Sequence, residues 1–142
     1  MNPHFNRFKN IITSPIQFKF FLLSKLPAAF FAGLSIQEFT TTKSVVRVKH
    51  SWFTQNPFRS MYFAVEPMAA EMASGMLVFG QVYKRQPAIS MLVVKMEVEF
   101  VKKATGVILF TCEEGEKIQE QINQSIQDGD AKTFICTSTG KN

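Results

Sequence analysis

The stretch NPFRSMYFAVEPMAAEMASG, residues 56–75, decides the fold, because it predicts an apolar helix. Met, Phe, Ala and Val dominate this stretch, and the pattern continues beyond it, so we expect a helix over about residues 60–80. A helix that is apolar nearly all round must be enclosed by other elements. It nevertheless carries Glu66 and Glu71, and a buried carboxylate without a partner is strongly destabilising. Either these glutamates face water or the fold uses one of them.

Five stretches around this helix have the composition of antiparallel strands. Residues 43–52 alternate, with Val46, Val48, His50 and Trp52 on one face and Val45, Arg47, Lys49 and Ser51 on the other. This period of two is typical of a half-buried antiparallel strand. The predicted strands are residues 34–41, 43–52, 89–102, 106–112 and 131–138. One antiparallel sheet curled around a single helix gives an α+β protein.

Residues 1–32 predict helices in front of the sheet. Ser14 is a suitable helix cap and Pro15 a suitable first residue for a helix to about Lys25, and Gly33 ends a short helical turn that follows. A small polar helix with Ile118, Ile122 and Ile126 on one stripe is expected later in the chain. A length of 142 residues predicts one domain, residues 1–142, with N-terminal helices over 1–32 and the sheet and central helix over 33–142.

Composition excludes several classes of function. The net charge of +5 is modest and the lysines are dispersed, so no nucleic-acid partner is expected. Cys112 and Cys136 form no CxxC pair and predict buried thiols in a reducing compartment, and two histidines cannot build a metal site. The stretch at residues 20–33 is interrupted by Lys25 and is shorter than a bilayer span. We therefore expect a cytoplasmic protein without stable membrane insertion.

The order of these elements over about residues 27–139 resembles that of the hotdog-fold acyl-CoA thioesterase superfamily. NPFRSMYFAVEPMAAE resembles the Asn-turn-helix motif of that family, and LPAAFFAGLSIQEF and SMLVVKMEVEFVKKATG resemble its flanking segments. Asn56 and Glu71 lie fifteen positions apart, as the Asn and the acid do in the branch related to phenylacetyl-CoA thioesterases. The inserted helix makes the chain most similar to the hotdog group called domain of unknown function 4442. The resemblance implies a hotdog fold, with five antiparallel strands wrapped around the central helix.

The resemblance also implies an activity, the hydrolysis of an acyl- or aryl-CoA thioester. The site would lie across a homodimer, with a tetramer as the alternative assembly, and would need no cofactor besides the CoA of the substrate. Glu71 would be the base or nucleophile, and Asn56 of the other subunit would hold the water or the carbonyl. The backbone N–H groups of Phe63 and Ala64 would polarise the thioester carbonyl.

Six further residues are candidates for substrate binding, and each has an ordinary structural alternative as strand, turn, packing or solvated residue. They are Tyr62, Met68, Ser90, Arg59, Lys102 and Lys103. The sequence departs from the family at Tyr62, Phe63 and Ala64, where the motif has a His-Gly-Gly-like triplet. Glycine there lets the backbone approach the thioester closely, so Phe63 should reshape the pocket. Glu71 has its own alternative, contact with solvent or with a dimer partner.

Two other functions remain open on the sequence. A non-catalytic binder of acyl-CoA or fatty acid would explain Phe63 and the fifteen Phe residues. A peripheral membrane protein would explain the mixture of basic and aromatic residues near the N-terminus. That mixture comprises Phe5, Arg7, Phe8, Lys9, Phe18, Lys19, Phe20 and Phe21. A hotdog dehydratase is disfavoured, because Pro57 stands where its catalytic His is required.

Overall fold

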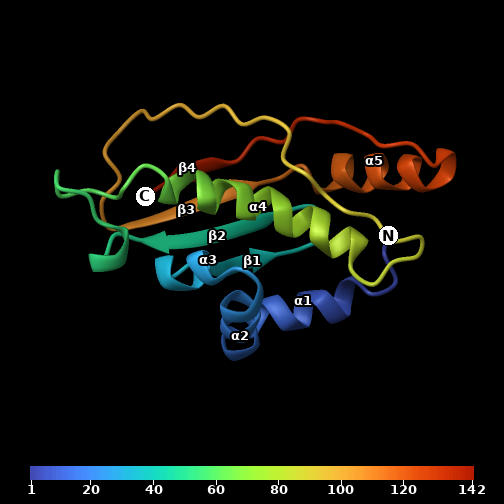
Figure 1. The fold of residues 1–142 in the computed structure, drawn as a ribbon, viewed down its shortest axis with the longest axis horizontal. Helices are drawn as coiled ribbons and strands as arrows, with labels where there is room; N and C mark the ends of the chain where they lie inside the picture. The colour runs from blue at the N-terminus through green and yellow to red at the C-terminus, as the bar shows by residue number, and fades with distance from the viewer.

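A computed structural model describes all residues from 1 to 142. Three helices come first, then a hairpin, a long helix, a third strand, another helix and a short last strand (Figure 1). The elements are α1 (Phe5–Thr13), α2 (Pro15–Lys25), α3 (Pro27–Ala32), β1 (Ser35–Phe39), β2 (Ser44–Lys49), the 3-10 helix η1 (Trp52–Thr54), α4 (Val65–Val82), β3 (Val107–Cys112), α5 (Gly115–Asp128) and β4 (Thr139–Lys141).

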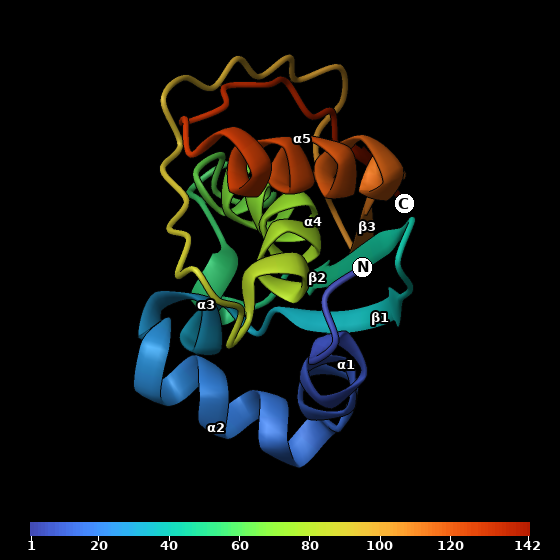
Figure 2. The same cartoon turned by 90° about the vertical axis from the view of Figure 1, so that its right-hand side faces the viewer.

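The four strands form one antiparallel sheet in the order β1-β2-β3-β4. Val46 pairs with Ile36 on one side and with Phe110 on the other, and a bulge interrupts β1 between Ile36 and Glu38. α4 packs across β2 and β3, as Figure 2 shows. The α+β class, the antiparallel sheet and the central helix are therefore confirmed, whereas the predicted count of five strands is wrong.

The sheet and α4 meet through a well-packed apolar layer. Val46 and Val48 of β2 are fully buried, and so are Ala69 and Ala73 of α4. Alanine at these helix positions lets the helix axis come close to the strands, because a small side chain adds little thickness between the two layers. Trp52, expected on the buried face with Val46 and Val48, is 75% exposed, because β2 ends at Lys49 and the chain turns into η1.

The N-terminal helices cover the β1 edge and one end of α4. Phe5 of α1 stacks on Phe39 of β1 with ring centroids 5.3 Å apart, and Phe8 packs against Phe79 of α4 at 4.8 Å. The Asn2 side chain donates hydrogen bonds to the carbonyls of Gly80 (2.9 Å) and Tyr83 (2.8 Å), which lie at the end of α4. Burial of these rings fixes α1 to the sheet. None of the helices combines the length and the apolar character that crossing a bilayer requires.

Residues 89–102 do not form the predicted strand. They are extended and exposed along most of their length, and none of their backbone groups bonds to another part of the chain. Alternation of apolar and polar residues reports two different faces, but a strand also needs a neighbour for its backbone hydrogen bonds. The segment has no such neighbour in the structure and arches beside α4 (Figure 1).

The predicted strand at 131–138 is also wrong, since the ladder to β3 includes only Thr139–Lys141. Side chains at the start of α5 bind the backbone of this segment instead. The Lys117 ammonium donates to the Ile135 carbonyl, and the Thr137 N–H donates to the Glu114 carboxylate at 2.5 Å. Phe134 and Cys136 still pack against the core, so the segment keeps a strand-like alternation without a strand's hydrogen bonds.

Candidate functional site

The turn before α4 is organised by Asn56. Its amide Nδ2 donates to Ser60 Oγ and to the Met61 carbonyl, both at 3.0 Å, and its Oδ1 accepts the Phe58 N–H at 2.8 Å. The side chain is thus fully used within residues 56–61, as in an Asx turn. This turn delays the helix, which was predicted from about residue 60 and begins at Val65. In a single chain, Asn56 is a structural residue.

Two backbone donors at the start of α4 are free. The N–H groups of Phe63 and Ala64 have no acceptor, whereas those of Val65 and Glu66 donate to the carbonyls of Tyr62 and Phe63. No side chain caps the helix at Ala64. Free N–H groups and the positive end of the helix dipole favour a developing negative charge at this place. These are the donors that the sequence predicted for a thioester carbonyl.

Glu71 lies half-buried in the middle of α4, and its carboxylate forms no ion pair or hydrogen bond. Its Oε1 lies over Gly75, beside Met91 of the extended segment. Burial raises the pKa of Glu71 above the ordinary value of 4.5. A carboxylate with a raised pKa and unused lone pairs is suited to accept a proton near neutral pH.

Glu71 and the free donors are too far apart to act on one carbonyl within a single chain. Ala64 precedes Glu71 by seven positions, which is about 10 Å along a helix. Both lie on nearly the same side of α4, since seven residues turn the helix by about 700°, close to two full turns. A base and an oxyanion donor must both reach the same reacting group at hydrogen-bond distance. Within one chain, the Glu71 carboxylate and the free N–H groups therefore stand at separate places along α4.

A cavity of about 310 Å³ opens at the start of α4, and it is lined by a carboxylate to which the sequence assigned no site role. Glu66 lines this cavity without a hydrogen bond or ion pair, and burial raises its pKa. Lys102 and Lys103 line it too, and the Phe63 ring meets Phe100 at 6.2 Å. The remaining lining residues are Ser60, Met61, Val101 and Ala104. An acidic residue in the first turn of a helix is normally assigned to the helix dipole, so only the cavity reveals this position.

The other predicted site residues lie apart from one another. Ser90 is exposed on the extended segment, and Met68 is half-buried against the core. Tyr62 is exposed and packs edge-on against Phe63 at 5.1 Å. Arg59 is exposed in the turn with φ 60°, and Lys103 donates to the Phe58 carbonyl at 3.1 Å. Of the predicted set, Phe63, Lys102 and Lys103 line the cavity at the start of α4.

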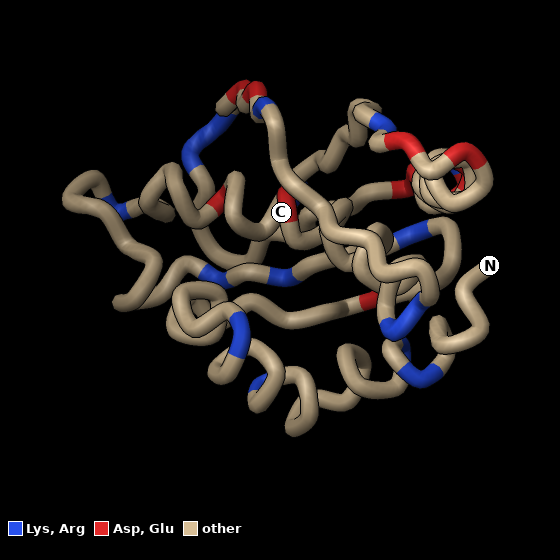
Figure 3. The backbone as a smooth tube through the Cα atoms, turned by 45° about the vertical axis from the view of Figure 1, so that its right-hand side comes forward, with Lys and Arg blue, Asp and Glu red and all other residues tan.

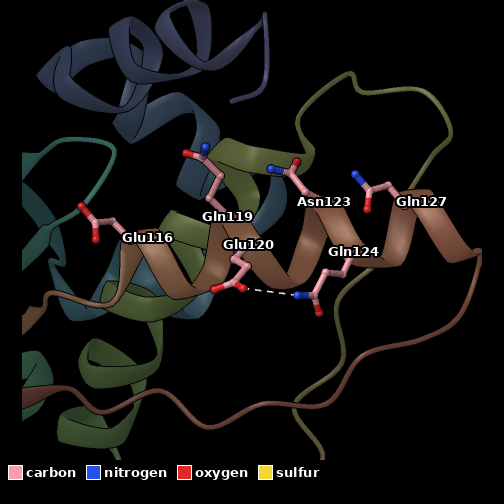
Figure 4. A pocket seen from close by; sticks show the side chains of 6 residues that line it. All are labelled: Glu116, Gln119, Glu120, Asn123, Gln124 and Gln127. Carbon is pink, nitrogen blue, oxygen red and sulfur yellow. Dashed lines mark hydrogen bonds between the residues drawn. The ribbon is translucent and has the colours of Figure 1, made fainter.

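A second hollow, of about 380 Å³, runs along the outer face of α5 (Figure 4). Its lining is entirely polar: Glu116, Gln119, Glu120, Asn123, Gln124 and Gln127. Gln124 donates to Glu120 at 3.3 Å, and Arg85 donates to Asn123 at 2.9 Å. This hollow offers no apolar wall for an acyl chain.

The structure brings no three His, Cys, Asp or Glu side chains together in a group that could hold a metal ion.

Solved structures share this fold at low sequence identity. A protein of unknown function from Chlorobaculum tepidum TLS, OLEI01261, aligns with TM-score 0.67 and 18% identity over 83% of this chain and 76% of its own. PA5026 from Pseudomonas aeruginosa, described as a probable thioesterase, aligns with TM-score 0.60 and 18% identity over 84% and 79%. The thioesterase HI1161 from Haemophilus influenzae aligns with TM-score 0.52 and 13% identity over 64% and 62%. At these identities the likenesses concern the fold alone.

The sequence itself gives a narrower result. No curated protein matches it. The model of one family matches residues 16–134, which run from the first turn of α2 to beyond the end of α5. The chain therefore belongs to the family described as domain of unknown function (DUF4442).

Proposed function

We propose that the protein is a thioesterase that hydrolyses an acyl- or aryl-CoA at a site formed by two copies of the chain. One observation carries the proposal: α4 bears a half-buried, unpartnered carboxylate, Glu71, and begins with the free N–H groups of Phe63 and Ala64. These are the base and the oxyanion donors that thioester hydrolysis requires. The fold shared with PA5026 and HI1161, whose descriptions name thioesterases, adds support.

In this proposal, the thioester carbonyl accepts hydrogen bonds from the N–H groups of Phe63 and Ala64 in one subunit. Glu71 of the other subunit takes a proton from a water molecule, which attacks the carbonyl carbon. The tetrahedral intermediate then collapses to the carboxylic acid and expels the CoA thiolate. Glu71 gives the proton that it took from water to this thiolate and is ready for the next cycle. Lys102 and Lys103 stand beside the helix start, where their ammonium groups suit the phosphates of CoA.

The segment 89–102 is the proposed contact between the two copies. It presents large apolar side chains to solvent, and its backbone N–H and C=O groups have no partner in the chain. An exposed row of this kind pairs readily with another strand. Pairing of two such segments would satisfy these groups and bury the apolar side chains. It would also bring Met91, which lies next to Glu71, close to the second copy.

Hydrolysis of a panel of acyl- and aryl-CoA thioesters tests the proposal. The wild-type chain should release CoA, and Glu71→Gln should lower turnover by roughly 10²–10⁴-fold, because it keeps the shape and removes the base. Glu66→Gln is the matched comparison on the same helix, since both carboxylates are unpartnered and have raised pKa values. Loss of turnover in Glu66→Gln alone would make Glu66 the base instead. If no thioester of the panel released CoA, the proposed thioesterase activity would be refuted.

A second candidate is a non-catalytic binder of acyl-CoA or fatty acid. The observation that favours it is the contact of Phe63 with Phe100 beside the oxyanion donors, where the family motif has glycine. These rings fill space that a thioester would need. Thermal stabilisation by a fatty acid or a non-hydrolysable acyl-CoA analogue, without any turnover, would identify the binder.

A further inference from the structure

We infer that the outer face of α2 docks on anionic lipid bilayers. The observation is that α2 carries large apolar side chains on its outer side as well as on its inner side. On its inner side, Phe18 and Leu22 are buried against the domain, as expected for a surface helix. On its outer side, where polar residues normally stand, Ile16 and Phe20 are each 70% exposed and Leu23 is 46% exposed. These three residues follow the i, i+4, i+7 spacing of one helix face, here called the α2 stripe.

The charges around the α2 stripe have a single sign. Residues 1–37 contain Arg7, Lys9, Lys19 and Lys25 and no Asp or Glu, since the first acidic residue is Glu38. None of these four basic residues forms an ion pair. Figure 3 shows only basic positions along the N-terminal helices, whereas acidic positions gather on α5 at the far side of the molecule. An anionic surface would therefore attract and orient the molecule with α2 toward it.

Exposed apolar side chains continue from α2 onto its neighbours. α3 packs against α2, and its Phe31 ring lies 6.2 Å from that of Phe53 in η1. Trp52, beside Phe53, is largely exposed. Aromatic rings next to basic residues are typical of helices that lie in the interface of a bilayer. α2 has 11 residues, about 16 Å of helix, which fits a helix lying on the membrane rather than across it.

Charge also argues against a second copy of the chain as the partner that covers the α2 stripe. Two α2 stripes facing each other would bring Lys19 and Lys25 of both copies together, and residues 1–37 contain no carboxylate to pair with them. Like charges brought together in this way oppose association.

The structure also changes which aromatic residues can reach a membrane, because Phe5, Phe8 and Phe18 are packed inward. Phe20 is the exposed phenylalanine of α2, flanked by Ile16 and Leu23.

Co-sedimentation of the full chain with two kinds of vesicle tests this inference. Vesicles of phosphatidylcholine with phosphatidylserine should bind the wild type, and vesicles of phosphatidylcholine alone should not. The double variant Ile16→Ser, Phe20→Ser should lower the bound fraction about tenfold or more through the lost apolar contact. Lys19→Glu with Lys25→Glu should lower it similarly, and added salt should weaken wild-type binding. Ile135→Ser is the matched control, because Ile135 is an exposed apolar residue (79%) outside the N-terminal helices.

The single tryptophan gives an independent readout, since Trp52 packs against Phe53, and Phe53 meets Phe31 of α3, the helix that packs against α2. Its fluorescence should shift to shorter wavelength on anionic vesicles and stay unchanged on neutral ones. The variants replace exposed side chains, so their circular dichroism should match that of the wild type. Wild type left in the supernatant with anionic vesicles, or binding that the α2 variants do not alter, would overturn the inference. A change from dimer to monomer in Ile16→Ser, Phe20→Ser would overturn it too, by making the stripe an interface between copies.

Discussion

The carboxylate of Glu71 lies directly over Gly75, one helical turn further along α4. Its Oε1 is 2.7 Å from the position that a β-carbon on residue 75 would occupy, and Met91 Cε is 3.6 Å from the same position. Any side chain at position 75 would therefore displace the carboxylate. The absence of a side chain at Gly75 creates the space in which the proposed base sits.

Gly75→Ala should separate activity from stability. Alanine is the better helix residue by roughly 0.5–1 kcal/mol, so the melting temperature should stay the same or rise. The new methyl group should push the Glu71 carboxylate aside and lower kcat/KM about 10- to 100-fold, as small misplacements of catalytic groups do. Ser74→Ala is the control, because the Ser74 hydroxyl bonds only the Glu71 backbone carbonyl. Full activity in Gly75→Ala would show that the carboxylate is not needed at this position.

Glu71→Gln should stabilise the protein at neutral pH. Burial raises the folded-state pKa of Glu71 above the ordinary value of 4.5. Between the ordinary pKa and the raised one, the folded state therefore binds more protons than the unfolded state. The stability of the wild type therefore falls as the pH rises through this window, whereas the neutral amide is unaffected. Urea unfolding should show a larger free energy of unfolding for Glu71→Gln at pH 7, with the gain shrinking as the pH approaches 4.5.

Ser74→Ala serves again as the comparison for this pH series. It removes no titratable group, so its difference from the wild type should be the same at every pH. A difference between Glu71→Gln and the wild type that is equally constant would contradict the raised pKa. It would place the Glu71 carboxylate in solvent and weaken the proposed role as a base.

Charges placed on the segment 89–102 should separate the proposed dimer. Leu92 and Val94 are 83% and 74% exposed in the single chain, so lysine at both positions should leave the folded monomer intact. Two lysines facing the same residues of a second copy would repel, and pairing should be lost. Light scattering should change from the dimer mass to the monomer mass, and hydrolysis should fall with it.

Ile16→Lys provides the control for this pair, since it adds a charge of the same sign to an exposed residue of α2, on the other side of the molecule (Figure 1). This variant should remain a dimer. A wild type that is already monomeric at micromolar concentration would contradict both the interface and the shared site.

The sequence predicted the central layer of the fold well because local patterns determine it. The period of two in residues 44–49 and the apolar character of α4 each report burial, and both elements are present. Residues 89–102 have the same alternation, yet their strand is absent, because hydrogen-bond pairing depends on a neighbour that the pattern does not identify. The same limit applies to 131–138, where Glu114 and Lys117 bind the backbone in place of a strand.

The candidate site was predictable only in part. The fifteen-residue spacing singled out Glu71, which is indeed half-buried and unpartnered. Spacing did not reveal that the Asn56 amide would form its hydrogen bonds within residues 56–61. An Asn before a Pro is equally suited to a turn and to a substrate-binding site. No sequence pattern marks Glu66 as a site residue, because its cavity depends on Phe100 and Lys102, which are distant in sequence. Cavities formed by remote segments have no local sequence signal.

Gly115→Ala should destabilise the fold through a backbone clash. A β-carbon at position 115 would lie 2.1 Å from the Thr41 carbonyl oxygen, and the Gly115 N–H already donates to the Thr42 carbonyl at 3.0 Å. Backbone cannot rotate away as a side chain can, so α5 must shift from the β1–β2 turn and disturb the buried Ile118 and Ile122. We expect a loss of about 2 kcal/mol in the free energy of unfolding, measured by urea denaturation. The neighbouring exposed Glu116→Ala should change it by less than about 0.5 kcal/mol. Equal stabilities for the two variants would mean that the start of α5 does not pack against this turn.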